Sequence, residues 1–158
     1  METRIKKIKF TSTDKISIQY EKINSKLSTW DEYSMTCADL PRPQLRTAMQ
    51  DLGPQVIEMC ELPKNYLDRI TVTGVSFSYG GEKEVMGATI TSQMKLSFSN
   101  CDLNLNTPHK ASESYNEYEA DPKQLLTDEC VDALYILCDE IKLYINGERA
   151  QVSMFAVV

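Results

Sequence analysis

The sequence contains a single histidine, no long apolar run, and an odd number of cysteines without paired short spacing. One histidine is too few for a typical zinc site, and five scattered cysteines favour reduced, mostly buried thiols over a disulfide framework. We therefore expect no metal and no cofactor. No apolar run reaches membrane-spanning length, and the charged start, residues 1–7, lacks the apolar segment of a signal peptide, so we expect a cytosolic protein with no membrane segment.

The motifs that identify common enzymes are also missing. There is no Walker loop, dinucleotide-binding fingerprint, paired-histidine zinc helix or nucleophile elbow. His109 follows Pro108 in a polar stretch, where a surface imidazole is expected rather than a general base. We therefore expect no catalytic residues. The alternative, a small enzyme, would require a pocket with perturbed titratable groups.

The charge of the chain is unevenly distributed. Residues 1–30 hold seven basic and three acidic residues, a net charge of +4, which leaves −10 for the rest of a chain whose total is −6. This asymmetry has two interpretations. Either the first segment forms a basic surface for phosphates, or its lysines keep strand edges soluble and unpaired.

Alternation of apolar and polar residues over 7–10 and 15–20 predicts a β-hairpin. Its outward face would be basic and polar. A third run, residues 27–37, extends the hairpin to a three-stranded meander. The inward face of the hairpin would consist of Ile8, Phe10, Ile16, Ile18 and Tyr20.

A second hairpin, over residues 70–79 and 85–98 with a Gly80-Gly81 turn, is expected to organise the fold. Because neither face is strongly polar, we expect helices on at least one. Gly74 and Gly87 lie inside the two strands and indicate bulges or close backbone contacts. Strict alternation places Thr71, Thr73, Val75, Phe77 and Tyr79 on one face and Ile70, Val72, Gly74, Ser76 and Ser78 on the other.

Helical spacing appears twice, after Pro43 and after Thr127. Gly53-Pro54 should interrupt the first helix, and Asn146-Gly147 should end the second. The polar segment 99–119 reads as a loop. We predict an α+β fold, an antiparallel sheet of about five strands with two helices in the order βββ-α-ββ-α. Residues 1–148 would form one domain, followed by a C-terminal peptide, 149–158.

The basic hairpin is the first candidate site. Lys7, Lys9 and Lys15, with Trp30 nearby, supply the charge and the aromatic ring that single-stranded DNA binding requires. Phe10 and Tyr20 would add stacking surfaces if they faced outward. If they face inward, as the alternation indicates, they are core residues, and both interpretations stay open.

The end of the chain is the second candidate site. The segment Gln151-Val152-Ser153-Met154-Phe155 resembles the pentapeptide with which bacterial replication and repair proteins bind the sliding clamp. The resemblance implies that Gln151, Met154 and Phe155 are the anchors, although Val152 and Met154 replace the commoner leucines. The alternative is that residues 151–158 form a last β-strand of the sheet.

Several longer segments resemble small uncharacterised proteins encoded by phages and prophages. They lie between residues 70 and 151 and include Thr73-Gly-Val-Ser-Phe, Met86-Gly-Ala-Thr-Ile-Thr, Leu105-Asn-Thr-Pro-His and Tyr144-Ile-Asn-Gly-Glu-Arg-Ala-Gln. This resemblance implies a phage origin and assigns no catalytic residue.

Together these features predict a non-enzymatic phage accessory protein of DNA replication or recombination. It would bind the host sliding clamp through its tail and single-stranded DNA through the basic hairpin. The alternative is an inhibitor of a host or defence nucleic-acid-binding protein, similar to anti-CRISPR proteins or DNA mimics. Unpaired sheet edges also leave homo-oligomerisation open.

Overall fold

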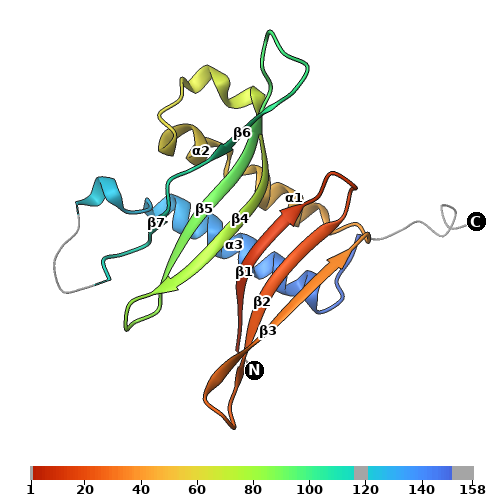
Figure 1. The fold of residues 1–158 in the computed structure, drawn as a ribbon, viewed down its shortest axis with the longest axis vertical. Coiled ribbons are helices and arrows are strands. Elements are labelled where there is room, and N and C mark those ends of the chain that lie inside the picture. The colour runs from red at the N-terminus through yellow and green to blue at the C-terminus, as the bar shows by residue number, and fades with distance from the viewer. Residues whose placement is uncertain (1, 116–120, 151–158) are drawn as a thin grey trace, which may run out of the picture.

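An antiparallel sheet with α-helices on one of its faces makes up the fold (Figure 1). The computed structural model describes residues 2–115 and 121–150. The strands are β1 (Thr3–Phe10), β2 (Ile16–Asn24), β3 (Thr29–Cys37), β4 (Ile70–Gly80), β5 (Val85–Met94), β6 (Leu103–Asn106) and β7 (Lys110–Ala111). The helices are α1 (Pro43–Gln50), α2 (Gly53–Met59), α3 (Asp128–Ile145) and the short 3-10 helices η1 (Lys64–Arg69) and η2 (Pro122–Gln124).

The strand order is β3-β2-β1-β4-β5-β6, with β7 also paired to β5, and every ladder between these strands is antiparallel. The predicted α+β class, the meander and the central hairpin are therefore confirmed, although the return strand predicted over 85–98 ends at Met94. The loop predicted for 99–119 is wrong where β6 and β7 form. Amide side chains make β6 possible, because Thr91 bonds to Asn106 at 2.9 Å and Gln93 to Asn104 at 3.4 Å across the ladder.

The helix α3 begins and ends where the sequence indicates. The Thr127 hydroxyl accepts a hydrogen bond from the Cys130 amide at 3.1 Å, and Gly147 follows the helix with a φ of +104°. Two acidic residues in the first turn complement the helix dipole. The first predicted helix is split into α1 and α2 at Gly53-Pro54, as expected.

Two bulges decide which side chains of the sheet face the helices. In β4, a register shift between Val72 and Gly74 brings Val72 into the core beside Val75, so the strict alternation predicted for this strand is wrong at Val72. In β1, a shift between Ile5 and Lys7 allows both Ile5 and Ile8 to be buried. Each bulge adds one residue to a strand. The side chains beyond the bulge therefore point to the opposite face of the sheet from the one that strict alternation predicts.

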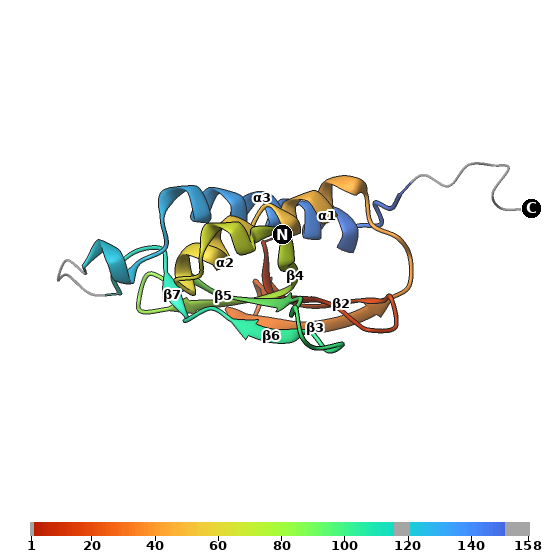
Figure 2. The ribbon, with the colours of Figure 1, turned by 90° about the horizontal axis from the view of Figure 1, so that it is seen from above.

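The core lies between the sheet and the helix layer. Figure 2 shows α1, α2 and α3 on the same side of the sheet, so no described helix covers the other side, which we call the open face. The inward residues Ile8, Ile16 and Ile18 are buried as predicted. No helix in the described ranges is long and apolar enough to cross a membrane.

Candidate nucleic-acid interface

Lys7 and Lys9 lie at the centre of the open face, in two rows of side chains that cross neighbouring strands. The first row consists of Ser34, Gln19, Lys7, Ser76 and Thr89. The second consists of Thr36, Ser17, Lys9, Gly74, Thr91 and Asn106. Neither row contains a carboxylate, although the chain as a whole carries a net charge of −6.

The local sequence of β1 places these lysines outward. Ile8 lies between them and is 0% exposed, so alternation turns Lys7 and Lys9 to the opposite side, where both are exposed. Lys15 is also exposed, and it begins the return strand. There the Thr11 amide donates to the Lys15 carbonyl at 2.8 Å, and the Lys15 amide donates to the Thr11 hydroxyl at 3.1 Å. The turn between β1 and β2 thus continues the line of lysines.

The three lysines keep their charge available. Within residues 2–115 and 121–150, none of them forms an ion pair. Two neighbouring basic residues behave differently, because Arg4 and Lys6 lie 3.4 Å and 3.5 Å from a carboxylate oxygen of the buried Glu21. Lys7, Lys9 and Lys15 therefore contribute positive charge that no carboxylate of the described residues neutralises.

Trp30 does not join the lysines. The Arg4 guanidinium carbon lies 4.0 Å from the centroid of the Trp30 ring and 4.7 Å from that of Tyr79. Trp30 and Tyr79 line a hollow together with Tyr135 and Cys138 of α3. The Trp30 ring is therefore packed in a cation–π contact with Arg4, an arrangement that sequence reasoning missed. No pattern of spacing links Arg4 to Trp30; the bulge in β1 and the β2–β3 pairing bring them together.

The other two aromatic residues of the basic hairpin, Phe10 and Tyr20, face inward. Phe10 and Tyr20 are partly buried against the core, as the alternation predicted. The Tyr20 ring stacks on Tyr33 of β3 with centroids 5.3 Å apart and an angle of 13° between the rings. The open face around the lysines therefore presents hydroxyl and amide groups, and none of the aromatic residues considered for base stacking.

His109 bonds to Ser78 at the border of the open face. Its Nε2 lies 2.6 Å from the Ser78 hydroxyl oxygen. A Cβ at Gly87 would lie 2.7 Å from the same nitrogen, so only glycine allows this contact. In the described ranges no carboxylate bonds to the imidazole, so the pair lacks the third member that would orient a catalytic base. The sequence signal was the glycine inside β5.

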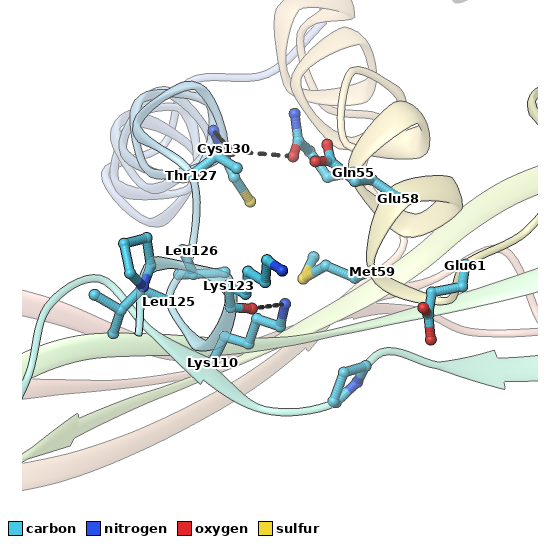
Figure 3. A pocket seen from close by; sticks show the side chains of 12 residues that line it. Gln55, Glu58, Met59, Glu61, Lys110, Lys123, Leu125, Leu126, Thr127 and Cys130 are labelled. Carbon is cyan, nitrogen blue, oxygen red and sulfur yellow. Dashed lines mark hydrogen bonds between the residues drawn. The ribbon is translucent and has the colours of Figure 1, made fainter. Parts of the chain in front are cut away.

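A hollow with a volume of about 600 Å³ lies elsewhere, between α2, β7, η2 and the first turn of α3 (Figure 3). Two acidic and two basic side chains line it, so their charges cancel. They are Glu58, Glu61, Lys110 and Lys123. Lys110 is further engaged, because its Nζ donates a hydrogen bond to the Lys123 carbonyl at 2.9 Å. The hollow therefore has no strong preference for an anion or a cation.

The thiol of Cys130 points into this hollow (Figure 3). Burial, reinforced by the nearby Glu58 and Glu129, raises its pKa to about 11, so the thiol is neutral near pH 7 and a poor nucleophile. The Thr127 hydroxyl donates to the Gln55 side-chain oxygen at 3.3 Å. The described part of the chain contains no group of histidine, cysteine and acidic residues that could hold a metal ion. The hollow thus supplies no activated catalytic group.

The anchors predicted in the tail, Gln151, Met154 and Phe155, lie outside the described residues. The last described residue is fixed, since the Ala150 amide donates to the Leu40 carbonyl at 3.0 Å. Arg149 packs on the Tyr144 ring, with its guanidinium carbon 3.6 Å from the ring centroid. The peptide therefore begins at a defined point of the domain surface, next to the connection between β3 and α1.

Comparison with known proteins gives no relative for this chain. No family model, no curated protein and no solved structure matches it. A functional assignment therefore depends on the geometry of the described residues and on the motifs of the sequence.

Proposed function

We propose that this chain is a non-enzymatic accessory protein of phage DNA replication or recombination. It holds the backbone of single-stranded DNA on the open face of its sheet, and it binds the sliding clamp of the bacterial host through residues 151–158. The observation that carries the proposal is the pair of rows centred on Lys7 and Lys9, which are free of carboxylates and of ion pairs.

The chemistry of these rows suits a phosphate backbone. Lysines contribute charge, while serine, threonine, asparagine and glutamine side chains donate hydrogen bonds to phosphate and sugar oxygens. Trp30 belongs to neither row and its ring packs against Arg4, so base stacking does not contribute at the rows. We therefore expect binding with little sequence preference. No described helix lies on this face to enter the major groove, which favours single strands over duplex.

The two contacts support each other. Two or three lysines give weak binding, and the acidic remainder of the protein opposes it. A sliding clamp encircles DNA, so a peptide bound to the clamp would hold the lysine face at a high local concentration near DNA. Linked weak contacts of this kind exceed either affinity alone.

Binding of a labelled oligothymidine, measured by fluorescence anisotropy, tests the DNA contact. The double variant Lys7→Ala/Lys9→Ala should lose affinity by about tenfold, because two phosphate contacts of up to about 1 kcal/mol each are removed. The matched control, Lys64→Ala/Lys83→Ala, removes the same charge from exposed positions outside the two rows and should bind as the unmodified chain does. Equal losses in both variants would reject a specific role for the open face.

Capture of purified clamp tests the second contact. Gln151→Ala/Phe155→Ala should abolish capture, while the thermal unfolding midpoint stays unchanged because the motif lies beyond the domain. Ser153→Ala is the matched control, since the resemblance assigns no anchor to it. Capture that survives the double change would reject the clamp contact and leave the DNA contact untouched.

The acidic helix side favours a second candidate, an inhibitor that mimics DNA. Four acidic side chains of α3 are exposed, and they are Asp128, Glu129, Asp132 and Asp139. A mimic binds a basic protein and ignores DNA, whereas a DNA-binding protein loses affinity for DNA steeply as salt rises. The same anisotropy titration therefore separates the two functions.

A further inference from the structure

The strand β3 lies at the edge of the described sheet. All nine residues, Thr29–Cys37, pair with β2, and no described strand lies beyond β3 (Figure 1). Proteins usually protect such an edge with proline, lysine or a bulge. β3 contains neither proline nor lysine, its charged residues are Asp31 and Glu32, and its register with β2 is unbroken. At the opposite border of the sheet, β6 has only four residues.

We propose that two copies of this chain pair along β3 in antiparallel orientation, centred on Tyr33, to form one continuous sheet. A two-fold axis perpendicular to the sheet relates the two strands of such a pair. The residue beside the axis lies opposite the same residue of the second copy. Tyr33 is the middle residue of β3, so this register alone pairs all nine residues. It places Asp31 opposite Met35 and Glu32 opposite Ser34 of the second copy.

The distribution of charge in β3 supports this register over its neighbours. Paired residues must point to the same face of the sheet. The axis can therefore move only from one residue to another, for example to Glu32 or Ser34. An axis at Glu32 would set two glutamates directly opposite each other, and an axis at Asp31 would do so with two aspartates, which is unfavourable. An axis at Ser34 avoids this but leaves two residues of each strand unpaired.

The tyrosines at the centre would form a continuous aromatic row. Tyr33 is 44% exposed although it stacks on Tyr20, and the Lys22 ammonium lies 5.7 Å from its ring centroid. In the paired state each Tyr33 would cover the exposed part of the other. Cross-strand aromatic pairs stabilise antiparallel ladders, so the exposed tyrosine gains a partner of matching chemistry.

The same axis would place both open faces on one side. A rotation about a perpendicular to the sheet keeps the helix layers together and the lysine rows together. Five strand spacings of about 4.8 Å would separate β1 from its copy, so the two sets of lysines would lie about 24 Å apart along one surface. The pairing itself does not depend on what that surface binds.

The C-terminal peptide is the competing occupant of this edge. Ala150 is bonded to Leu40, three residues after β3 ends, so the last described residue lies close to one end of this edge. A peptide running back along β3 would be antiparallel to it and would exclude a second copy. The experiments must therefore distinguish a second copy from this segment.

Disulfide trapping tests the register directly. Strands paired in this way bring the Cα atoms of facing residues to about 4.5–5.5 Å, within the range of a disulfide. In a background with the exposed Cys101 changed to serine, Tyr33→Cys should form an intermolecular disulfide under mild oxidation. The matched control Asp31→Cys should not, because residue 31 would face Met35 of the second copy. Equal cross-linking of both variants, or none in either, would overturn the proposal.

Sedimentation velocity across a concentration series, without nucleic acid, tests the unmodified chain. We expect a concentration-dependent dimer that Tyr33→Lys abolishes, because two lysines would then face each other, and that Tyr33→Thr retains. Removal of residues 151–158 should leave the dimer unchanged. A chain that is monomeric throughout, or that dimerises only after this removal, would overturn the proposal, and neither result bears on DNA binding.

Discussion

Gly74 of β4 packs directly against the backbone of Ile8 in β1: a Cβ at residue 74 would lie 2.9 Å from the Ile8 carbonyl oxygen. Gly74 also pairs with Lys9, next to the bulge of β4. The two halves of the sheet, the meander and the central hairpin, are joined through this β1–β4 ladder. The absence of one side chain is therefore what lets the lysine rows continue across the sheet.

Gly74→Ala should weaken this junction. The added methyl group meets backbone rather than a flexible side chain, so β1 and β4 must separate by several tenths of an ångström. We expect the free energy of unfolding to fall by about 1–3 kcal/mol, measured by urea denaturation. Ser76→Ala, two residues along the same strand and half-exposed, is the control and should change it by less than about 0.5 kcal/mol. Equal stability of the two variants would contradict the close contact.

Gln50→Ala should destabilise the bulge in β4. The Gln50 side chain donates from Nε2 to the Val72 carbonyl at 3.1 Å and accepts from the Val72 amide at 3.2 Å. Val72 is 1% exposed, so truncation leaves two buried backbone groups without partners. We expect a loss of about 2–4 kcal/mol in the free energy of unfolding. Gln44→Ala, at an exposed position of the same helix, should have little effect, and a similarly small effect at Gln50 would refute this role.

The regular parts of the fold were predictable because they follow simple periods. Alternation around Ile8 and Ile18 gave the first hairpin, and the Thr127 cap with Gly147 gave the limits of α3. The bulges were not predictable, because each depends on a partner distant in sequence. Gln50 satisfies the backbone of Val72 only after α1 packs on β4, and no local pattern encodes that contact.

The candidate site was predictable in part for the same reason. The outward direction of Lys7 and Lys9 follows from alternation alone. The location of Trp30 does not, since it depends on the bulge in β1 and on Arg4. Nearness in sequence suggested that Trp30 adjoins the lysines, whereas the Trp30 ring packs against Arg4 and lies in neither row.

Stability should decline at alkaline pH because of buried thiols. Burial raises the pKa of Cys138 to about 12 and that of Cys130 to about 11, from an ordinary value of 9.0. Below pH 9 both thiols are protonated in the folded and the unfolded chain, so they add no pH dependence. Above pH 9 the unfolded chain loses these protons first, and the free energy of unfolding falls by up to about 1.4 kcal/mol per pH unit for each thiol.

Urea denaturation at pH 8, 9 and 10 measures this decline. Cys138→Ala removes one titrating thiol, so the stability gap between this variant and the unmodified chain should narrow as the pH rises above 9. Cys101→Ala is the control for removal of a thiol from an exposed position. Parallel pH profiles for the unmodified chain and Cys138→Ala would show that the thiol does not contribute.

The salt dependence of oligothymidine binding tests the open face most directly. If Lys7, Lys9 and Lys15 each neutralise one phosphate, the logarithm of the affinity should fall with the logarithm of salt concentration with a slope of about −2. The slope should drop to about −0.7 for Lys7→Ala/Lys9→Ala and stay near −2 for Lys64→Ala/Lys83→Ala. Identical slopes for the two double variants, or no binding of DNA by the unmodified chain at low salt, would contradict the account.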